Sequence, residues 1–197
     1  MTKPKIWLSS PHMGGNEQQF VNEAFDTNWV APLGPNVTGF ENDLETFLGN
    51  TSYVAALSSG TAAIHLGLVL LDIKPNDVVI CQSFTFSASA NPILYQGATP
   101  VFIDSEEETW NMCPKALEEA ILDRISKGKK PKAIIPVHLY GMPYKVDEVR
   151  KIADDFTKIG NTSNLYLNEN IENIDFIHWS DSTWNNLDNI VRVRDVI

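Results

Sequence analysis

Three short segments carry side chains that could bind or transform a small molecule, and the first is Ser58-Ser59-Gly60-Thr61. It joins an apolar run directly to a helix-like run. Gly60 permits a tight turn, and the hydroxyls of Ser59 and Thr61 lie beside the free N–H groups of a helix start, an arrangement that suits a phosphate. The same residue types are ordinary helix caps. Spacing alone therefore leaves phosphate binding and plain capping open, with capping the commoner case.

The other two segments are Phe84-Thr85-Phe86 and the stretch from His138 to Tyr140, and each follows an apolar run. An aromatic side chain at such a place can stack on a flat cofactor ring, although core packing is the commoner role. His138 is a candidate acid or base, although a histidine at a strand end is more often a hydrogen-bonded structural residue.

The elements that must position these residues alternate regularly from residue 53 onward. Short apolar runs predict strands, the first of them buried, and longer segments predict helices between them. The strands are expected at 53–57, 78–81, 100–103 and 133–137, and the helices at 61–71, 87–95, 114–126 and 146–156. Such alternation predicts an α/β fold with a mainly parallel sheet and flanking helices. Ligands bind outside the carboxyl ends of such strands, where all three segments lie.

The regions on either side of this pattern differ from it. Residues 1–52 are interpreted as an N-terminal arm with helices at 16–26 and 40–48, joined by a loop rich in proline and glycine. Residues 157–197 contain eight asparagines, one glycine, and no alanine or proline. Only 190–197 has strand character there, from its valine and isoleucine content. We therefore divide the chain into 1–52, an α/β domain at 53–156, and a divergent tail at 157–197.

Composition narrows the classes of partner and compartment. Fifteen lysines and arginines stand against 25 aspartates and glutamates, for a formal net charge of −10. A field of this sign disfavours nucleic acid and anionic membrane surfaces as partners. Two cysteines are too few for a disulfide framework and lack the spacing of a zinc site. We expect no metal centre and no membrane span, and a location in the reducing cytoplasm.

Five ordered segments together resemble the DegT/DnrJ/StrS family of pyridoxal-phosphate-dependent sugar aminotransferases. They are WVAPLGPNVTGFE, ALSSGTAAIHLGL, SFTFSASANPI, GATPVFIDSEEETWNMCP and PVHLYGMPYKVDEV, and the resemblance covers about residues 6–156. It implies an incomplete large domain of the aspartate-aminotransferase fold (PLP-dependent transferase type I). It also implies a homodimer, and transfer of an amino group from glutamate to a nucleotide-linked keto sugar in cell-surface polysaccharide or amino-sugar biosynthesis.

The resemblance also implies roles for individual residues. Gly60 and Thr61 match the positions that bind the cofactor phosphate through a backbone N–H and a hydroxyl, with Ser59 beside them. Phe86 matches the aromatic residue that stacks on the pyridine ring. Trp29 and the loop 32–35 fall in the family's N-terminal active-site region.

Later parts of the chain depart from the family pattern. The Glu-Asp-Ala motif, whose Asp pairs with the pyridine nitrogen, and the Schiff-base lysine motif are not recognisable. Asp175, Asp181 and Lys158 lie in contexts that do not match them. No catalytic residue is assigned, and His138 belongs to a family segment without being the Schiff-base residue. Because positioning alone supplies little transaminase chemistry, we expect residues 1–197 to be inactive by themselves.

Several interpretations remain open from the sequence. The chain is a truncated or frameshifted aminotransferase, a fragment that a second polypeptide completes, or a degenerate protein that binds phosphate or nucleotide. A nucleotide-binding α/β protein without pyridoxal phosphate would use the same Ser-Gly-Thr turn, but it has no fingerprint of its own here. A sugar dehydratase of the same fold and a purely structural interaction module are further alternatives.

Overall fold

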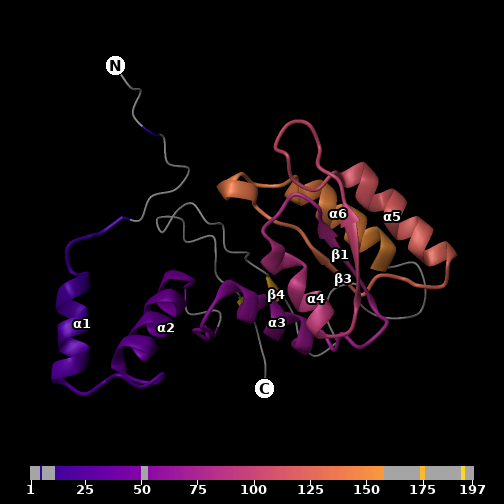
Figure 1. Ribbon diagram of the computed structural model, residues 1–197. Coiled ribbons are helices and arrows are strands. Elements are labelled where there is room, and N and C mark those ends of the chain that lie inside the picture. Colours follow the sequence, from indigo (N-terminus) through magenta and orange to yellow (C-terminus); the bar gives the residue numbers. More distant parts are fainter. Residues whose placement is uncertain (1–4, 6–11, 50–52, 158–173, 176–191, 194–197) are drawn as a thin grey trace.

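The computed structural model describes residues 5, 12–49, 53–157, 174–175 and 192–193 (Figure 1). α1 and α2 lie beside the layered part of the molecule, which contains the sheet and the later helices. In chain order the elements are α1 (Glu17–Asp26), α2 (Pro35–Phe47), α3 (Gly60–Leu70), β1 (Val78–Gln82), the 3₁₀ helix η1 (Ser87–Ser89), α4 (Asn91–Tyr95), β2 (Thr99–Ile103), α5 (Pro114–Ser126), β3 (Ala133–Ile135), the 3₁₀ helix η2 (Leu139–Gly141), α6 (Val146–Thr157), β4 (Ile174–Asp175) and β5 (Arg192–Val193).

The larger of the described sheets is parallel and has the strand order β2-β1-β3. In the register of β1, Ile80 is paired with Val101 on one side and with Ile134 on the other. All five residues of β1 are buried, since this strand has a neighbour on each side and helices over each face. A continuous apolar run is what a parallel strand covered on both faces requires.

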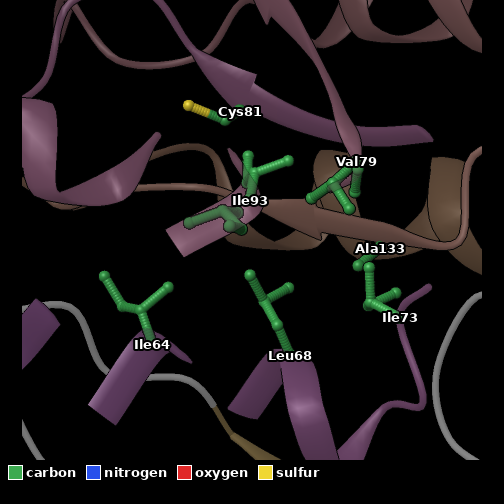
Figure 2. Packing of buried hydrophobic residues seen from close by; sticks show 9 residues of the cluster. Ile64, Leu68, Ile73, Val79, Cys81, Ile93 and Ala133 are labelled. Carbon is green, nitrogen blue, oxygen red and sulfur yellow. The ribbon is translucent and has the colours of Figure 1, made fainter. Parts of the chain in front are cut away.

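Two apolar clusters hold the layers together. On one face Val79 and Cys81 of β1 pack with Ile64 and Leu68 of α3 and with Ile93 of α4 (Figure 2). On the other face Ile80 of β1 packs with side chains of α5 and α6, among them Leu117, Ile121, Val149 and Phe156. The alternation of side chains along β1 therefore divides the core into two halves, and the α/β architecture expected from the sequence is confirmed.

Most predicted elements are present, with shifted ends. Residues 87–95, expected as one helix, form η1 and then α4, because Pro92 has no N–H to donate and is accommodated in the first turn of a new helix. α2 begins at Pro35 rather than at residue 40, since proline is preorganised for the first helical position. The observed β4 and β5 are two-residue strands paired antiparallel. β5 falls within the strand expected at 190–197, whose other residues lie outside the described ones.

The prediction of a buried strand at 53–57 is wrong. Tyr53 forms a single β-bridge, and residues 54–57 have no regular structure. Tyr53 is 67% exposed and Leu57 44% exposed. An apolar run becomes a buried strand only when neighbouring strands flank it, and the described parallel sheet consists of β2, β1 and β3.

Instead of a neighbouring strand, two carboxylates of α2 accept hydrogen bonds from backbone N–H groups of residues 53–57. The N–H of Val54 donates to Glu45 Oε1 at 3.0 Å, and the N–H of Ala56 donates to Glu41 Oε1 at 2.8 Å. Glu41 and Glu45 are one helical turn apart, which matches the spacing of alternate amides along an extended chain. α2 is thereby tied to the extended segment through side chains.

Candidate cofactor site

The topology identifies one edge of the sheet as a place for a ligand. The chain leaving β1 passes through η1 and α4, on the face covered by α3, whereas the chain leaving β3 passes into α6 on the opposite face. The carboxyl ends of β1 and β3 are therefore a topological switch point. In open α/β sheets, ligands bind in the crevice that such a divergence creates.

The amino end of α3 lies at this same edge. In Figure 2, Ile64 lies on the side of Cys81, and Ile73 lies towards Val79 and Ala133 at the other end. α3 therefore runs antiparallel to β1, with Gly60 at the carboxyl edge of the sheet. The first N–H groups of a helix have no acceptor within it and favour an anion.

Ser59 caps this helix. Its backbone is extended (φ −168°, ψ 160°), and Ser59 Oγ accepts a hydrogen bond from the N–H of Ala62 at 3.1 Å. A hydroxyl that accepts a bond keeps one hydrogen to donate, so capping and phosphate binding are compatible. Gly60 and Thr61 are half-buried in the first turn.

The aromatic residues after β1 are exposed, so core packing, the commoner interpretation, does not apply to them. Phe86 is 64% exposed and Phe84 45% exposed. Phe84 meets Trp110 edge to face, with ring centroids 6.2 Å apart. Thr85 is held by a hydrogen bond between its Oγ1 and Ser89 Oγ at 2.8 Å. Phe86 is thus an exposed aromatic residue in the loop that follows the carboxyl end of β1.

His138 makes the contacts of a hydrogen-bonded structural residue. Its ring stacks on Tyr144, with centroids 4.8 Å apart, and its Nδ1 accepts a hydrogen bond from the N–H of Tyr144 at 3.3 Å. In the neutral ring this places the proton on Nε2. Tyr140 is 56% exposed and adopts a left-handed conformation with φ 51°.

In the N-terminal region Trp29 lies against the loop 32–35. A Cβ added at Gly34 would come within 2.8 Å of Trp29 Cε3, so glycine lets the chain pass close beneath the indole. The N–H of Trp29 donates to the carbonyl of Ala24 at 2.8 Å, which closes the end of α1. The structure therefore joins Trp29 to its own loop, and Trp29 is 50% exposed.

Lys145, the residue just before α6, is already ion-paired. Lys145 Nζ lies 3.0 Å from Glu108 and 3.4 Å from Glu106, and these carboxylates, Glu108 first, raise the pKa of the ammonium. A protonated, ion-paired lysine is a poor nucleophile. For Asp175 only the backbone is described, and Asp181 and Lys158 lie outside the described residues.

Two further residues at this edge, Gln82 and Asn111, escaped the sequence analysis. Both are completely buried, and their amides bond to loops after β1 and β3. The available signal was a glutamine that ends the otherwise apolar run VVICQ. An amide at a buried strand end must find partners, and the nearest ones are loop backbones.

The parallel sheet, its switch point and the helix that begins at that edge are those of a ligand-binding α/β protein. The chain belongs to the DegT/DnrJ/EryC1/StrS aminotransferase family, whose model matches residues 11–157. The resemblance stated from the five segments is confirmed.

Relatives are found among named proteins and solved structures. Bacillus subtilis EpsN, whose name assigns it to the pyridoxal phosphate-dependent aminotransferases, is 55% identical over 152 residues, which are 77% of this chain and 39% of EpsN. GDP-perosamine synthase of Caulobacter vibrioides is 39% identical over 76% of this chain and 38% of its own. The chain thus spans about two fifths of the length of these curated relatives.

The solved structures agree with this assignment. The PMP form of Spr1654 from Streptococcus pneumoniae, whose name assigns it to the sugar aminotransferases, superimposes with a TM-score of 0.68 and 31% identity, over 78% of this chain and 36% of that one. NtdA from Bacillus subtilis, with bound cofactor PMP, gives a TM-score of 0.64 and 31% identity over 79% of this chain and 36% of its own. These findings confirm the incomplete large domain and point to pyridoxal phosphate as cofactor. None of the described helices is long and apolar enough to cross a bilayer.

Proposed function

We propose that this chain is the part of a sugar aminotransferase that holds the phosphate and one ring face of pyridoxal phosphate. The observation that carries the proposal is that α3 begins at the edge of the sheet where β1 ends and leads into the loop of the exposed Phe86. Residues 53–156 form the binding domain, residues 1–52 an arm, and residues 157–197 a segment outside the family pattern.

The phosphate end of the cofactor fits the first turn of α3. The N–H groups of Gly60 and Thr61 and the hydroxyls of Ser59 and Thr61 would donate to phosphate oxygens. Gly60 brings the backbone close to the anion, since no side chain intervenes. A helix start accommodates one phosphate even in a chain of net charge −10.

The ring end fits Phe86. An exposed phenyl ring next to a switch point offers a flat apolar face, and offset stacking on an aromatic ring contributes about 0.5–1.5 kcal/mol beyond the area buried. When bound, pyridoxal phosphate supplies an electron sink for amino transfer. The role of Phe86 is to exclude water from one face and to fix the ring plane.

The names of relatives support the substrates that we propose for the complete reaction. One relative is a GDP-perosamine synthase and another is a spore coat polysaccharide biosynthesis protein. These names support a nucleotide-linked sugar as acceptor and a role in cell-surface polysaccharide or amino-sugar biosynthesis. A keto form of that sugar and glutamate as the amino donor enter the proposal from the family resemblance. A cytoplasmic homodimer completes the proposal.

Residues 1–197 alone should bind the cofactor without transferring amino groups. Lys145 is ion-paired, and neither the cofactor-linking lysine motif nor the pyridine-nitrogen carboxylate motif is recognisable in the sequence. Glutamate-dependent amination of a keto sugar nucleotide by this polypeptide, measured by mass spectrometry, would contradict this part of the proposal.

Titration of the full chain with pyridoxal 5′-phosphate tests the site. We expect saturable binding, and Thr61→Val should raise the Kd about tenfold, equivalent to about 1.4 kcal/mol. Thr99→Val is the matched control, because Thr99 begins β2 at the opposite edge of the sheet. Equal binding by wild type and Thr61→Val would overturn the site. Tight binding of UDP or GDP without pyridoxal phosphate would favour the nucleotide-binding alternative.

A further inference from the structure

We propose that Gln82 and Asn111 form a positioning pair that holds the loop of Phe86 and the loop of His138 in a fixed relation across the switch point. The inference rests on the proposed cofactor site and adds to it the residues that fix its geometry. Neither side chain is assigned to touch the cofactor.

Gln82 connects the two loops directly. It is the last residue of β1 and is completely buried. Its Nε2 donates to the carbonyl of Phe84 at 2.8 Å, and its Oε1 accepts from the N–H of Val137 at 3.0 Å. One amide therefore bonds to the loop after β1 and to the chain that continues from β3.

Asn111 extends the connection and is also completely buried. Its Oδ1 accepts from the N–H of Leu139 at 2.9 Å and from Gln82 Nε2 at 3.4 Å. Its Nδ2 donates to the carbonyl of Met142 at 2.8 Å and to Thr109 Oγ1 at 3.2 Å. The loop between β2 and α5, which carries Asn111, is thereby joined to the other two.

His138 is bracketed by this pair. Gln82 holds the N–H of the residue before it, and Asn111 holds the N–H of the residue after it. Gln82 also holds the carbonyl of Phe84, two residues before Phe86. The two amides therefore hold the backbone on both sides of His138, and Gln82 also holds the backbone of the loop that carries Phe86.

The concentration of buried polar groups at this edge supports a positioning role. Among the described residues, the fully buried polar side chains are Gln82, Ser89 and Asn111. Ser89 bonds to Thr85, so all three stabilise loops at the carboxyl edge. Apolar side chains would fill the same volume without a desolvation cost, whereas satisfied amides specify one loop arrangement.

The test compares the binding of pyridoxal 5′-phosphate, which has a ring, with that of inorganic phosphate, which has none. In the full chain, Gln82→Met removes the hydrogen bonds of Gln82 to Phe84, Val137 and Asn111 at similar side-chain length. We expect the Kd for pyridoxal 5′-phosphate to rise about tenfold, equivalent to about 1.4 kcal/mol. The inhibition constant of inorganic phosphate, measured as a competitor, should stay within about twofold, since α3 holds the phosphate. The matched control is Gln96→Met, because Gln96 pairs with His65 at 2.6 Å near the opposite edge.

Hydrogen exchange of the unliganded chain gives a second readout and does not depend on the proposed function. Gln82→Met should expose the Val137 amide to fast exchange, with Leu139 less affected. If Gln82→Met does not fold, Asn111→Leu serves with the Leu139 amide as its readout, since Asn111 Oδ1 accepts from that N–H. Equal losses for both ligands, or unchanged exchange of the readout amide (Val137 for Gln82→Met, Leu139 for Asn111→Leu), would overturn the inference. If wild type binds no pyridoxal phosphate, the proposed function fails and the exchange result still decides this inference.

Discussion

Ser59 shows how one side chain at this edge can serve both the fold and the site. Its Oγ accepts the Ala62 N–H, which satisfies a helix-start donor, and its own hydrogen remains available to a phosphate oxygen. The choice between capping and phosphate binding that the sequence left open is therefore not exclusive. Under the proposed function, the stability of the helix start and the affinity for phosphate depend on the same hydroxyl.

Replacing Ser59 should separate these contributions. We expect Ser59→Ala to lower the free energy of unfolding by about 1 kcal/mol, the usual cost of losing an N-cap, and to weaken pyridoxal phosphate binding as well. Urea denaturation and a cofactor titration measure the two effects. Ser58→Ala removes a neighbouring exposed hydroxyl and should change neither quantity. An equal effect of both substitutions would exclude a specific capping role.

Glu106 gives a prediction of pH dependence. Hydrogen bonds from the Thr109 hydroxyl and from the N–H groups of Glu108 and Thr109, together with Lys145, lower the pKa of its carboxyl from 4.5 to about 2. A carboxyl whose pKa is depressed on folding stabilises the protein above its unfolded pKa. That contribution is lost as the pH falls from 4.5 towards 2.

Urea unfolding of wild type and Glu106→Gln at several pH values checks this sign. The variant should be less stable at pH 7, and the difference should shrink as the pH falls from about 4.5 towards 2. Asp104→Asn, in the same loop, is the comparison. A difference between wild type and Glu106→Gln that does not change with pH would show that the ionised carboxylate contributes nothing to the fold.

The place of a single residue in the site could be predicted from the sequence when neighbouring residues along the chain indicate it. Ser59, Gly60 and Thr61 are adjacent, and the structure confirms their place at a helix start, although their cofactor contacts remain a prediction. Gln82 and Asn111 are 29 positions apart and bond to backbone atoms of a third segment. No local pattern indicates such a meeting, because it depends on how the strands pair and on the course of the loop between β2 and α5.

Helices were predictable because a helix makes its own backbone hydrogen bonds. Strands were predictable where the strands beside them belong to the same alternating sequence pattern. α5 was located from Pro114 to Ser126, because a proline at its first turn and an apolar stripe mark it. Residues 53–57 were not, because a strand exists only with neighbours, and composition cannot show which strands will pair with it. α2 supplies its carboxylates to that segment instead.

α3 offers a prediction at this scale, because its two faces differ sharply. Leu68 is 1% exposed in the cluster against β1, whereas Leu66 is 38% exposed. Leu68→Ala should lower the free energy of unfolding by about 2–5 kcal/mol through the cavity it leaves. Leu66→Ala should cost less than about 1 kcal/mol. Similar losses for both, measured by urea denaturation, would contradict the packing of α3 on the sheet.

For the whole molecule, burial is distributed unevenly. α1 and α2 contain no buried residue, and Phe20, Phe25, Phe40 and Phe47 are each at least 55% exposed. The layers around β1 contain both apolar clusters. Because local stability follows buried apolar contact, the arm should open at a lower free energy than the sheet domain.

Hydrogen exchange followed by mass spectrometry tests this difference with a matched pair of helices. α2 and α5 have 13 residues each and begin with proline, but α5 buries Pro114, Leu117 and Ile121. Amides of α2 should exchange at least about a hundredfold faster than those of α5, equivalent to about 2.7 kcal/mol. Equal protection would mean that the exposed phenyl rings of the arm are covered in solution. Protection of α2 that rises with protein concentration would identify a second copy of this chain as the cover, since only association depends on concentration.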